Sequence, residues 1–211
     1  SCGITFIGPK SETISLMGNK ANARIQMQQS GVPVIPGSEG FIDNVEEARK
    51  IAEKVGYPVL LKAAAGGGGK GIRRVNSEEE LTNAYEEARR EALSAFGDSR
   101  MYLEKIMENV KHIEVQVFRD EFGHSVYFPE RDCSIQRNKQ KMIEESPCSL
   151  VTPEQRKQLG EIAVRAVDAI DYRNTGTIEF LMDKNHRFYF MEMNTRIQVE
   201  HTVTEMVTGV D

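Results

Sequence analysis

Two glutamates and an asparagine near the C-terminal end of the chain have the residue types and spacing of a magnesium site. Glu179 lies in one of two apolar stretches that flank a polar turn, and Glu192 and Asn194 belong to the other. If the turn is centred between Asn185 and His186, the two stretches pair as a hairpin in which Glu179 lies opposite Glu192. Alternation along the second strand predicts that Asn194 shares a face with Glu192.

Two opposed carboxylates repel each other, at a cost of up to about 1 kcal/mol on an exposed face. A divalent cation would relieve this repulsion, and magnesium prefers oxygen ligands that it shares with substrate phosphates. The same alternation places Phe188 and Phe190 on the face of Glu192. Two alternatives remain open, a solvated acidic hairpin and a register shifted by one residue, which would separate the two glutamates.

A run of glycines is the second candidate for chemistry. Gly66 to Gly69, Lys70 and Gly71 follow an apolar strand that ends at Lys62. Glycines let backbone N–H groups approach an anion closely. No GK[ST] ending completes a phosphate loop of the Walker type, and a strand follows where a dinucleotide site has a helix. We therefore expect a flap that closes over phosphates, with a flexible surface hairpin as the alternative.

The elements that position these residues alternate between helices and strands. We expect helices at 11–18, 20–29, 44–55, 77–96 and 152–170, and a further helical pattern from about Glu200. Asn44 and Thr152 are predicted N-caps, and Ser77 to Glu80 has the pattern of a capping box. We expect strands at 4–7, 57–62, 72–75, 101–105, 112–119, 125–130, 176–182 and 187–193.

Composition excludes several classes of protein. The net charge of -5 gives no reason to expect a nucleic-acid partner. No run of about 18 apolar residues exists, so no membrane span is predicted. Three cysteines lie far apart without CxxC spacing, which argues against a disulfide framework and a zinc site and favours a reducing cytosol. Because the sequence begins on a bare strand and stops just after a helical pattern, we expect it to be a central piece of a longer enzyme.

The stretch from Glu192 to His201, EMNTRIQVEH, strongly resembles the biotin carboxylases of the ATP-grasp superfamily. Further matches run along nearly the whole chain: GPK, MGNKA, YLEKIMEN, HIEVQV, ERDCSIQR and GTIEFL. The resemblance implies an α/β (α+β) chain with the ATP-grasp fold. It implies that residues 1–35 end an N-terminal domain, that 36–107 form a lid, and that 108–211 begin the larger catalytic domain.

The resemblance also implies a reaction. ATP phosphorylates bicarbonate to carboxyphosphate with magnesium or manganese, and the carboxyl group passes to biotin on a carrier protein or domain. Glu200 would be the general base, and Arg196 and Lys141 would hold bicarbonate together with Gln198 and the backbone of Val199. Glu179, Glu192 and Asn194 would bind the metal. The nucleotide would contact Lys20, Lys62, Gly68, Gly69, Glu104, Lys105, Met107, His112, Gln136, Lys139 and Leu181. On these assignments, a local basic pocket would form from Lys62, Lys105, Lys139, Lys141 and Arg196.

Two departures from the family pattern are visible. Asn138 and Lys139 stand where the family often has arginine and histidine, and lysine can donate to a phosphate but cannot stack. The family's biotin-binding arginine lies beyond Asp211. The implied partners are a carboxyltransferase component, as in acetyl-CoA carboxylase, and further copies of the same chain, in the cytoplasm. The alternatives are another bicarbonate-phosphorylating ligase, of the carbamoyl-phosphate synthetase kind, and a nucleotide-binding module without turnover.

Overall fold

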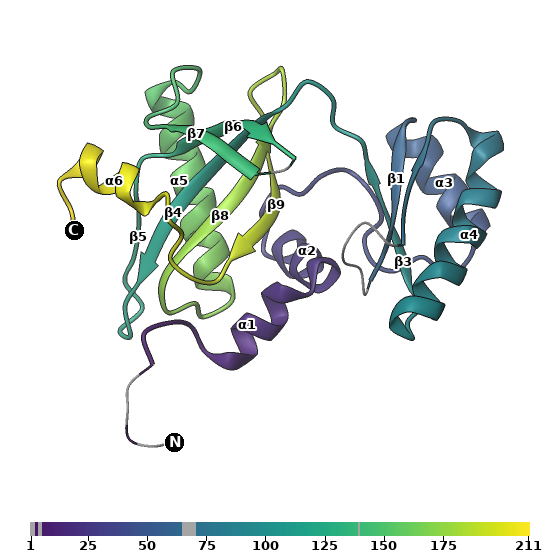
Figure 1. The fold of residues 1–211 in the computed structure, drawn as a ribbon, viewed down its shortest axis with the longest axis horizontal. Coiled ribbons are helices and arrows are strands. Elements are labelled where there is room, and N and C mark those ends of the chain that lie inside the picture. The colour runs from purple at the N-terminus through teal and green to yellow at the C-terminus, as the bar shows by residue number, and fades with distance from the viewer. Residues whose placement is uncertain (1–2, 4–5, 65–70, 139) are drawn as a thin grey trace. The chain divides into compact units, whose positions relative to one another are not determined.

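The computed structural model describes residues 3, 6–64, 71–138 and 140–211, which form two compact units (Figure 1). Unit 1 takes its residues from Ser1–Gly18, Gln26–Val34 and Asn109–Asp211, and unit 2 from Asn19–Ile25 and Ile35–Glu108. The helices are α1 (Ser11–Gly18), α2 (Lys20–Gln29), α3 (Val45–Val55), α4 (Glu78–Phe96), α5 (Pro153–Ala169) and α6 (His201–Thr208). The strands are β1 (Val59–Ala63), β2 (Ile72–Val75), β3 (Met101–Lys105), β4 (Lys111–Arg119), β5 (Ser125–Tyr127), β6 (Arg131–Arg137), β7 (Gln140–Glu145), β8 (Asn174–Met182) and β9 (Phe188–Asn194).

Unit 2 contains a three-stranded antiparallel sheet in the order β2-β1-β3, on which α3 and α4 pack. The helices begin where the sequence predicts. Asn44 caps α3 by accepting a hydrogen bond from the backbone N–H of Glu47. Ala48 and Ala52 of α3 and Ala88 and Ala92 of α4 are fully buried in one cluster with Leu61 and Leu103, so the core of this unit forms between the helices and one sheet face.

Unit 1 contains a larger antiparallel sheet in the order β7-β6-β4-β8-β9, with β5 pairing β4. Helix α5 covers one face of this sheet (Figure 1). It starts with the predicted cap, in which the Thr152 hydroxyl accepts from the backbone of Gln155 and the Gln155 side chain accepts from the backbone of Thr152. Apolar residues of β4 and β8, such as Ile113 and Phe180, are fully buried. Since side chains alternate along a strand, their neighbours His112, Glu114 and Glu179 lie on the other face.

The β8–β9 hairpin confirms the predicted pairing of Glu179 with Glu192 but reaches it by a different route. Near the turn, Phe180 lies opposite Phe190, and the register shifts by one residue at Met191. Opposed residues point to the same face, so the phenylalanines lie on the face away from Glu179. The prediction that Phe190 shares a face with Glu192 was therefore wrong, because a bulge inserts one extra residue and reverses the alternation.

Two smaller expectations also differ from the structure. Ser77 is the N-cap of α4, but its side chain makes no capping hydrogen bond, and Glu80 instead accepts from Asn76. Of the predicted strand at 4–7, Ile4 and Thr5 lie outside the described residues, and 6–7 are not in a strand. Glycines 66–69, Lys70 and Lys139 lie outside them too. Over the described residues, no helix is both long and apolar enough to cross a membrane.

Gly37 offers a test of how tightly unit 2 is packed. A Cβ atom at Gly37 would lie 2.1 Å from the carbonyl oxygen of Leu103, a backbone atom that cannot rotate away. We expect Gly37→Ala to lower the free energy of unfolding by about 1–3 kcal/mol, as overpacking does elsewhere. Gly40→Ala is the control, since a Cβ there meets nothing within 4 Å. Urea unfolding of both variants measures the difference, and equal midpoints would contradict the packing argument.

Candidate active site

A row of charged residues crosses the open face of the unit 1 sheet. Arg131 of β6 lies opposite Glu114 of β4, Glu114 opposite Glu179 of β8, and Glu179 opposite Glu192 of β9. Arg131 and Glu114 are fully buried, and the Arg131 Nε donates to a Glu114 oxygen at 2.7 Å. The sheet therefore places three carboxyl groups on adjacent strands, with a cation at one end of the row.

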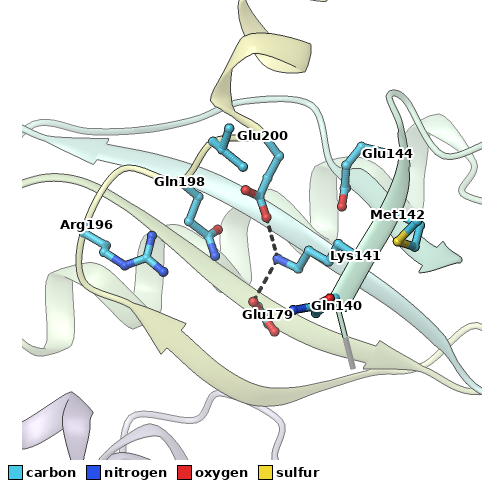
Figure 2. A pocket seen from close by; sticks show the side chains of 9 residues that line it. Gln140, Lys141, Met142, Glu144, Glu179, Arg196, Gln198 and Glu200 are labelled. Atoms are coloured by element: carbon cyan, nitrogen blue, oxygen red, sulfur yellow. Dashed lines mark hydrogen bonds and ion pairs between the residues drawn. The ribbon is translucent and has the colours of Figure 1, made fainter. Parts of the chain in front are cut away.

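Lys141 of β7 joins this row to the segment before α6. Its Nζ donates to Glu179 at 3.0 Å and to Glu200 at 2.9 Å (Figure 2). It also donates to Glu114. Burial alone would lower the pKa of Lys141, but the surrounding carboxylates outweigh burial and raise it. Lys141 is therefore a permanent cation, and it brings the predicted base Glu200 and the predicted metal ligand Glu179 to one point.

Glu179 is held ionised by its neighbours. Burial would raise the pKa of Glu179, but a hydrogen bond with the His112 ring at 2.7 Å and the charge of Lys141 overcome it and hold the pKa at about 2. The other ring nitrogen of His112 lies 2.7 Å from Gln136 Nε2. His112 and Gln136, which the resemblance assigns to the nucleotide, thus contact each other, and His112 also contacts the row of charged residues. Leu181, two residues beyond Glu179 on β8, lies opposite His112 and is half-buried.

An open pocket of about 450 Å³ surrounds Lys141 (Figure 2). Its wall includes Lys141 and Arg196, but also the carboxyl groups of Glu144, Glu179 and Glu200. Of the five residues expected to form a basic pocket, Lys141 and Arg196 line this one, beside these carboxyl groups. Lys62 and Lys105 belong to unit 2, where Lys62 pairs with Glu104 and Lys105 donates to the carbonyls of Gly56 and Tyr57. Lys139 lies outside the described residues, so the basic pocket stays a prediction.

The RIQVEH segment reaches the pocket as a turn, because α6 begins only at His201. The helical pattern predicted from about Glu200 is therefore confirmed, and a turn, not a shared helix, positions Arg196 and Glu200. Gln198 is buried, and its Oε1 has no hydrogen-bond partner, which is expensive unless a donor from a ligand binds there. Val199 lines the pocket and is 85 % exposed, so solvent or a ligand can reach it there. Burial would raise the pKa of Glu200, but the hydrogen bond from Lys141 lowers it, so Glu200 is ionised at neutral pH.

The hairpin carboxylates fit a magnesium ion by donor type. Glu179, Glu192 and Asn194 offer oxygen atoms on one face of two neighbouring strands. The Asn194 amide donates its NH2 group to Glu179 at 2.8 Å, so a rotation of the amide would turn its oxygen to an ion. Lys141 and His112 already offset the charge of Glu179, so the carboxylate pair does not by itself require a metal.

The remaining nucleotide candidates lie in unit 2. Lys20 is the exposed first residue of α2, and Met107 follows β3 and is half-buried. Lys62 is the last residue but one of β1, beside β3, and its Nζ donates to the buried Glu104. The structure therefore brings Lys62 and Glu104 together.

Comparison with known proteins places this geometry in a family. The profile of the carbamoyl-phosphate synthase L chain, ATP binding domain, matches residues 19–211. The chain belongs to this ATP-grasp family.

Its relatives include biotin carboxylases. The 2-oxoglutarate carboxylase small subunit of Hydrogenobacter thermophilus is 56 % identical over 99 % of this chain and 44 % of its own length. Biotin carboxylase 1 of Bacillus subtilis is 54 % identical over 99 % of this chain and 46 % of its own length. The chain thus spans about half the length of these relatives.

Solved structures agree. A biotin carboxylase from Campylobacter jejuni in complex with β-γ-ATP matches with a TM-score of 0.87 and 55 % identity, over 99 % of this chain and 47 % of that one. The biotin carboxylase domain of H. thermophilus 2-oxoglutarate carboxylase, in complex with MgADP, ADP and bicarbonate, matches with a TM-score of 0.86 and 56 % identity, over 99 % and 46 % of the two chains. The predicted ATP-grasp fold and the resemblance to biotin carboxylases are confirmed.

Sequence reasoning missed three residues of this ATP-grasp site: Glu114, Arg131 and Glu144. Alternation in HIEVQV was the available signal, since it sets Glu114 on the face of His112. Glu144 lines the pocket, and both its carboxyl oxygens are shielded without a hydrogen-bond partner. One oxygen lies within 4.8 Å of a Glu114 oxygen and of the Cys133 sulfur. Burial and the charge of Glu114 raise the pKa of Glu144 to about 8.

Glu144 gives the stability of the chain a pH dependence. Between its ordinary pKa and about 8, the folded chain keeps a proton that the unfolded chain has released, so this contribution to stability is lost as pH rises through about 8. Glu144→Gln cannot lose a proton there. We expect this variant to unfold at a higher urea concentration than the wild type at pH 9, and the gap to be smaller at pH 5. Glu145→Gln, at the exposed neighbour, is the control, and parallel pH curves for wild type and Glu144→Gln would refute the assignment.

Proposed function

We propose that this chain is the ATP-binding part of a biotin carboxylase, which carboxylates carrier-bound biotin using ATP and bicarbonate. One observation carries the proposal: Lys141 binds Glu179 and Glu200 at the same time, in a pocket that also holds Gln198 and Arg196. A predicted metal ligand, a predicted base and predicted anion-binding groups thus share one small space. The names and bound ligands of the related structures support the same reaction.

In this proposal, Glu200 removes the proton from bicarbonate. Its low pKa keeps it ionised, and Lys141 stays cationic and can hold both the base and the anion. The guanidinium of Arg196 is exposed at the mouth of the pocket and offers a planar fork that suits a carboxylate-like anion. Gln198 lines the same pocket, and its amide NH2 group can donate a hydrogen bond to an oxygen of bicarbonate.

Magnesium or manganese would be held by Glu179, Glu192 and Asn194, and would neutralise charge on the phosphates during transfer. An ion there would compete with Lys141 for Glu179. Ion binding would therefore weaken the Lys141–Glu179 contact and leave Lys141 able to bind bicarbonate. Lys20, Lys62, Glu104, Lys105, Met107, His112, Gln136 and Leu181 would contact the nucleotide. We propose that residues 36–107 act as the lid, with Gly68 and Gly69 over the phosphates and Lys139 as a further phosphate contact.

The wider assignments follow from the proposal. The partners would be a biotin carboxyl carrier protein or domain, a carboxyltransferase component and further copies of the chain, in the cytoplasm. The second candidate is a bicarbonate-phosphorylating ligase of the carbamoyl-phosphate synthase kind, which the matched family description favours. The two differ in the acceptor of the activated carboxyl group.

Free biotin separates the two candidates. We expect the full-length protein to release ADP from ATP in the presence of bicarbonate and magnesium, and free biotin to increase the rate, because biotin consumes the carboxyphosphate. A coupled assay for ADP, with and without biotin, measures the effect. Stimulation by ammonia in place of biotin would favour the second candidate, and no bicarbonate dependence would contradict both.

Glu200 is the residue to remove. Glu200→Gln keeps the size and hydrogen-bonding capacity of the side chain but cannot take a proton, so we expect the bicarbonate-dependent rate to fall by about 10²- to 10⁴-fold. Binding of ATP, measured by calorimetry, should persist. Glu205→Gln is the matched control, because Glu205 lies on α6 and pairs with His201 outside the pocket. A rate within a few-fold of wild type in Glu200→Gln would exclude Glu200 as the base.

A further inference from the structure

Arg24 of α2 is buried in unit 2 with much of its hydrogen-bonding capacity unused. The residue is 6 % exposed. Its Nη2 donates to the carbonyl of Ser38 at 3.2 Å, whereas Nε and Nη1 are shielded from solvent and have no hydrogen-bond partner. A buried donor without an acceptor is expensive, so a second arrangement in which these groups are used is favoured.

The nearest carboxylate is that of Glu104. The Arg24 Nε lies 3.8 Å from Glu104 Oε1, just beyond a hydrogen bond, and Lys62 holds the other oxygen, Oε2. Two cations therefore share one carboxylate, and the cluster carries a surplus positive charge. Tyr102 beside it does not offset this charge, because burial raises the pKa of the phenol and keeps it neutral. Lys62 can leave the cluster without stranding Glu104 unpaired.

The backbone around Glu104 is fixed, so only side chains can exchange. Gly37 bridges Glu104 from the opposite side of β3, and the backbone N–H of Lys105 donates to the carbonyl of Pro36 at 2.7 Å. Ser38, which anchors Arg24, is itself held by hydrogen bonds with the backbone of Leu103. Arg24 and Glu104 are thus both held by the segment around Ser38 and by β3. A small side-chain movement would bring the Arg24 Nε and Glu104 Oε1, now 3.8 Å apart, within hydrogen-bond distance.

We propose that Arg24 is a positioning residue that takes over Glu104 when Lys62 turns to a nucleotide phosphate. The inference rests on the proposed function, which assigns Lys62 to ATP. Without a phosphate, Glu104 is shared by Lys62 and Arg24. With a phosphate, Lys62 binds the anion, and Arg24 alone keeps the buried carboxylate paired and in place. Arg24 therefore sets how easily Lys62 is released, without touching the nucleotide itself.

The test is a double-mutant comparison in the full-length protein. Arg24→Met removes the second cation, so Glu104 retains Lys62, and we expect the affinity for MgATP to fall about tenfold or more, by calorimetry. In the background of Glu104→Gln, the neutral side chain needs no counter-ion. The same Arg24→Met change should then lower the affinity for MgATP only slightly. Glu104→Gln by itself lowers the affinity for MgATP, since Glu104 is assigned to adenine. The quantity compared is therefore the effect of Arg24→Met in the wild-type background against its effect in the Glu104→Gln background.

Each outcome decides something. An equal loss in both backgrounds would mean that Arg24 supports only the fold, and no loss in the wild-type background would also overturn the proposal. Arg24→Lys should recover part of the affinity, because it keeps the charge. If Arg24→Met does not fold, as judged by its thermal midpoint, Arg24→Lys carries the same comparison in the two backgrounds. Failure of the wild type to bind MgATP would overturn the proposed function, whereas normal binding with an additive Arg24 effect would overturn the present inference alone.

Discussion

The ammonium group of Lys141 is the interaction on which this site depends. Its three carboxylate partners come from β4, β8 and the turn before α6, so one cation joins two neighbouring strands to a segment that is not part of the sheet. Without it, Glu114 and Glu179 would lie opposite each other on neighbouring strands with less positive charge to offset their repulsion. Glu200 would also lose the hydrogen bond that lowers its pKa. Binding of an anion or a metal ion must therefore redistribute the bonds of Lys141.

The charges of the site balance only as a group. Arg131 and Lys141 neutralise Glu114 between them, His112 and Lys141 hold Glu179 ionised, and Glu144 remains the carboxyl group with a raised pKa. Buried carboxylates this close together cannot all ionise without cost, so the proton collects on the one that lacks a partner. A similar sharing occurs in unit 2, where Arg24 and Lys62 surround Glu104.

Much of the secondary structure could be predicted from local patterns. The caps at Asn44 and Thr152 follow from short-range rules, and the structure confirms them. The pairing of Glu179 with Glu192 is also confirmed, but a bulge at Met191 is needed to produce it. The bulge at Met191 could not be predicted, because the alternation of residues along the second strand does not contain it. The contribution of Glu144 to the pocket was also beyond prediction, since Glu144 lies outside the matched motifs and reaches the pocket only through strand order.

The sequence by itself determined the family, the fold and the residue types of the site, because the EMNTRIQVEH stretch and the flanking motifs are specific and nearly continuous. Only the tertiary structure decided which of those residues touch. Lys141 reaches Glu200 across 59 positions of the chain, and Arg24 approaches Glu104 from a separate helix. Such contacts are set by the strand order of the sheet, by one bulge and by burial. These features bring separate charges close together, so that the protonation state and the partners of each group depend on its neighbours and not on the local sequence.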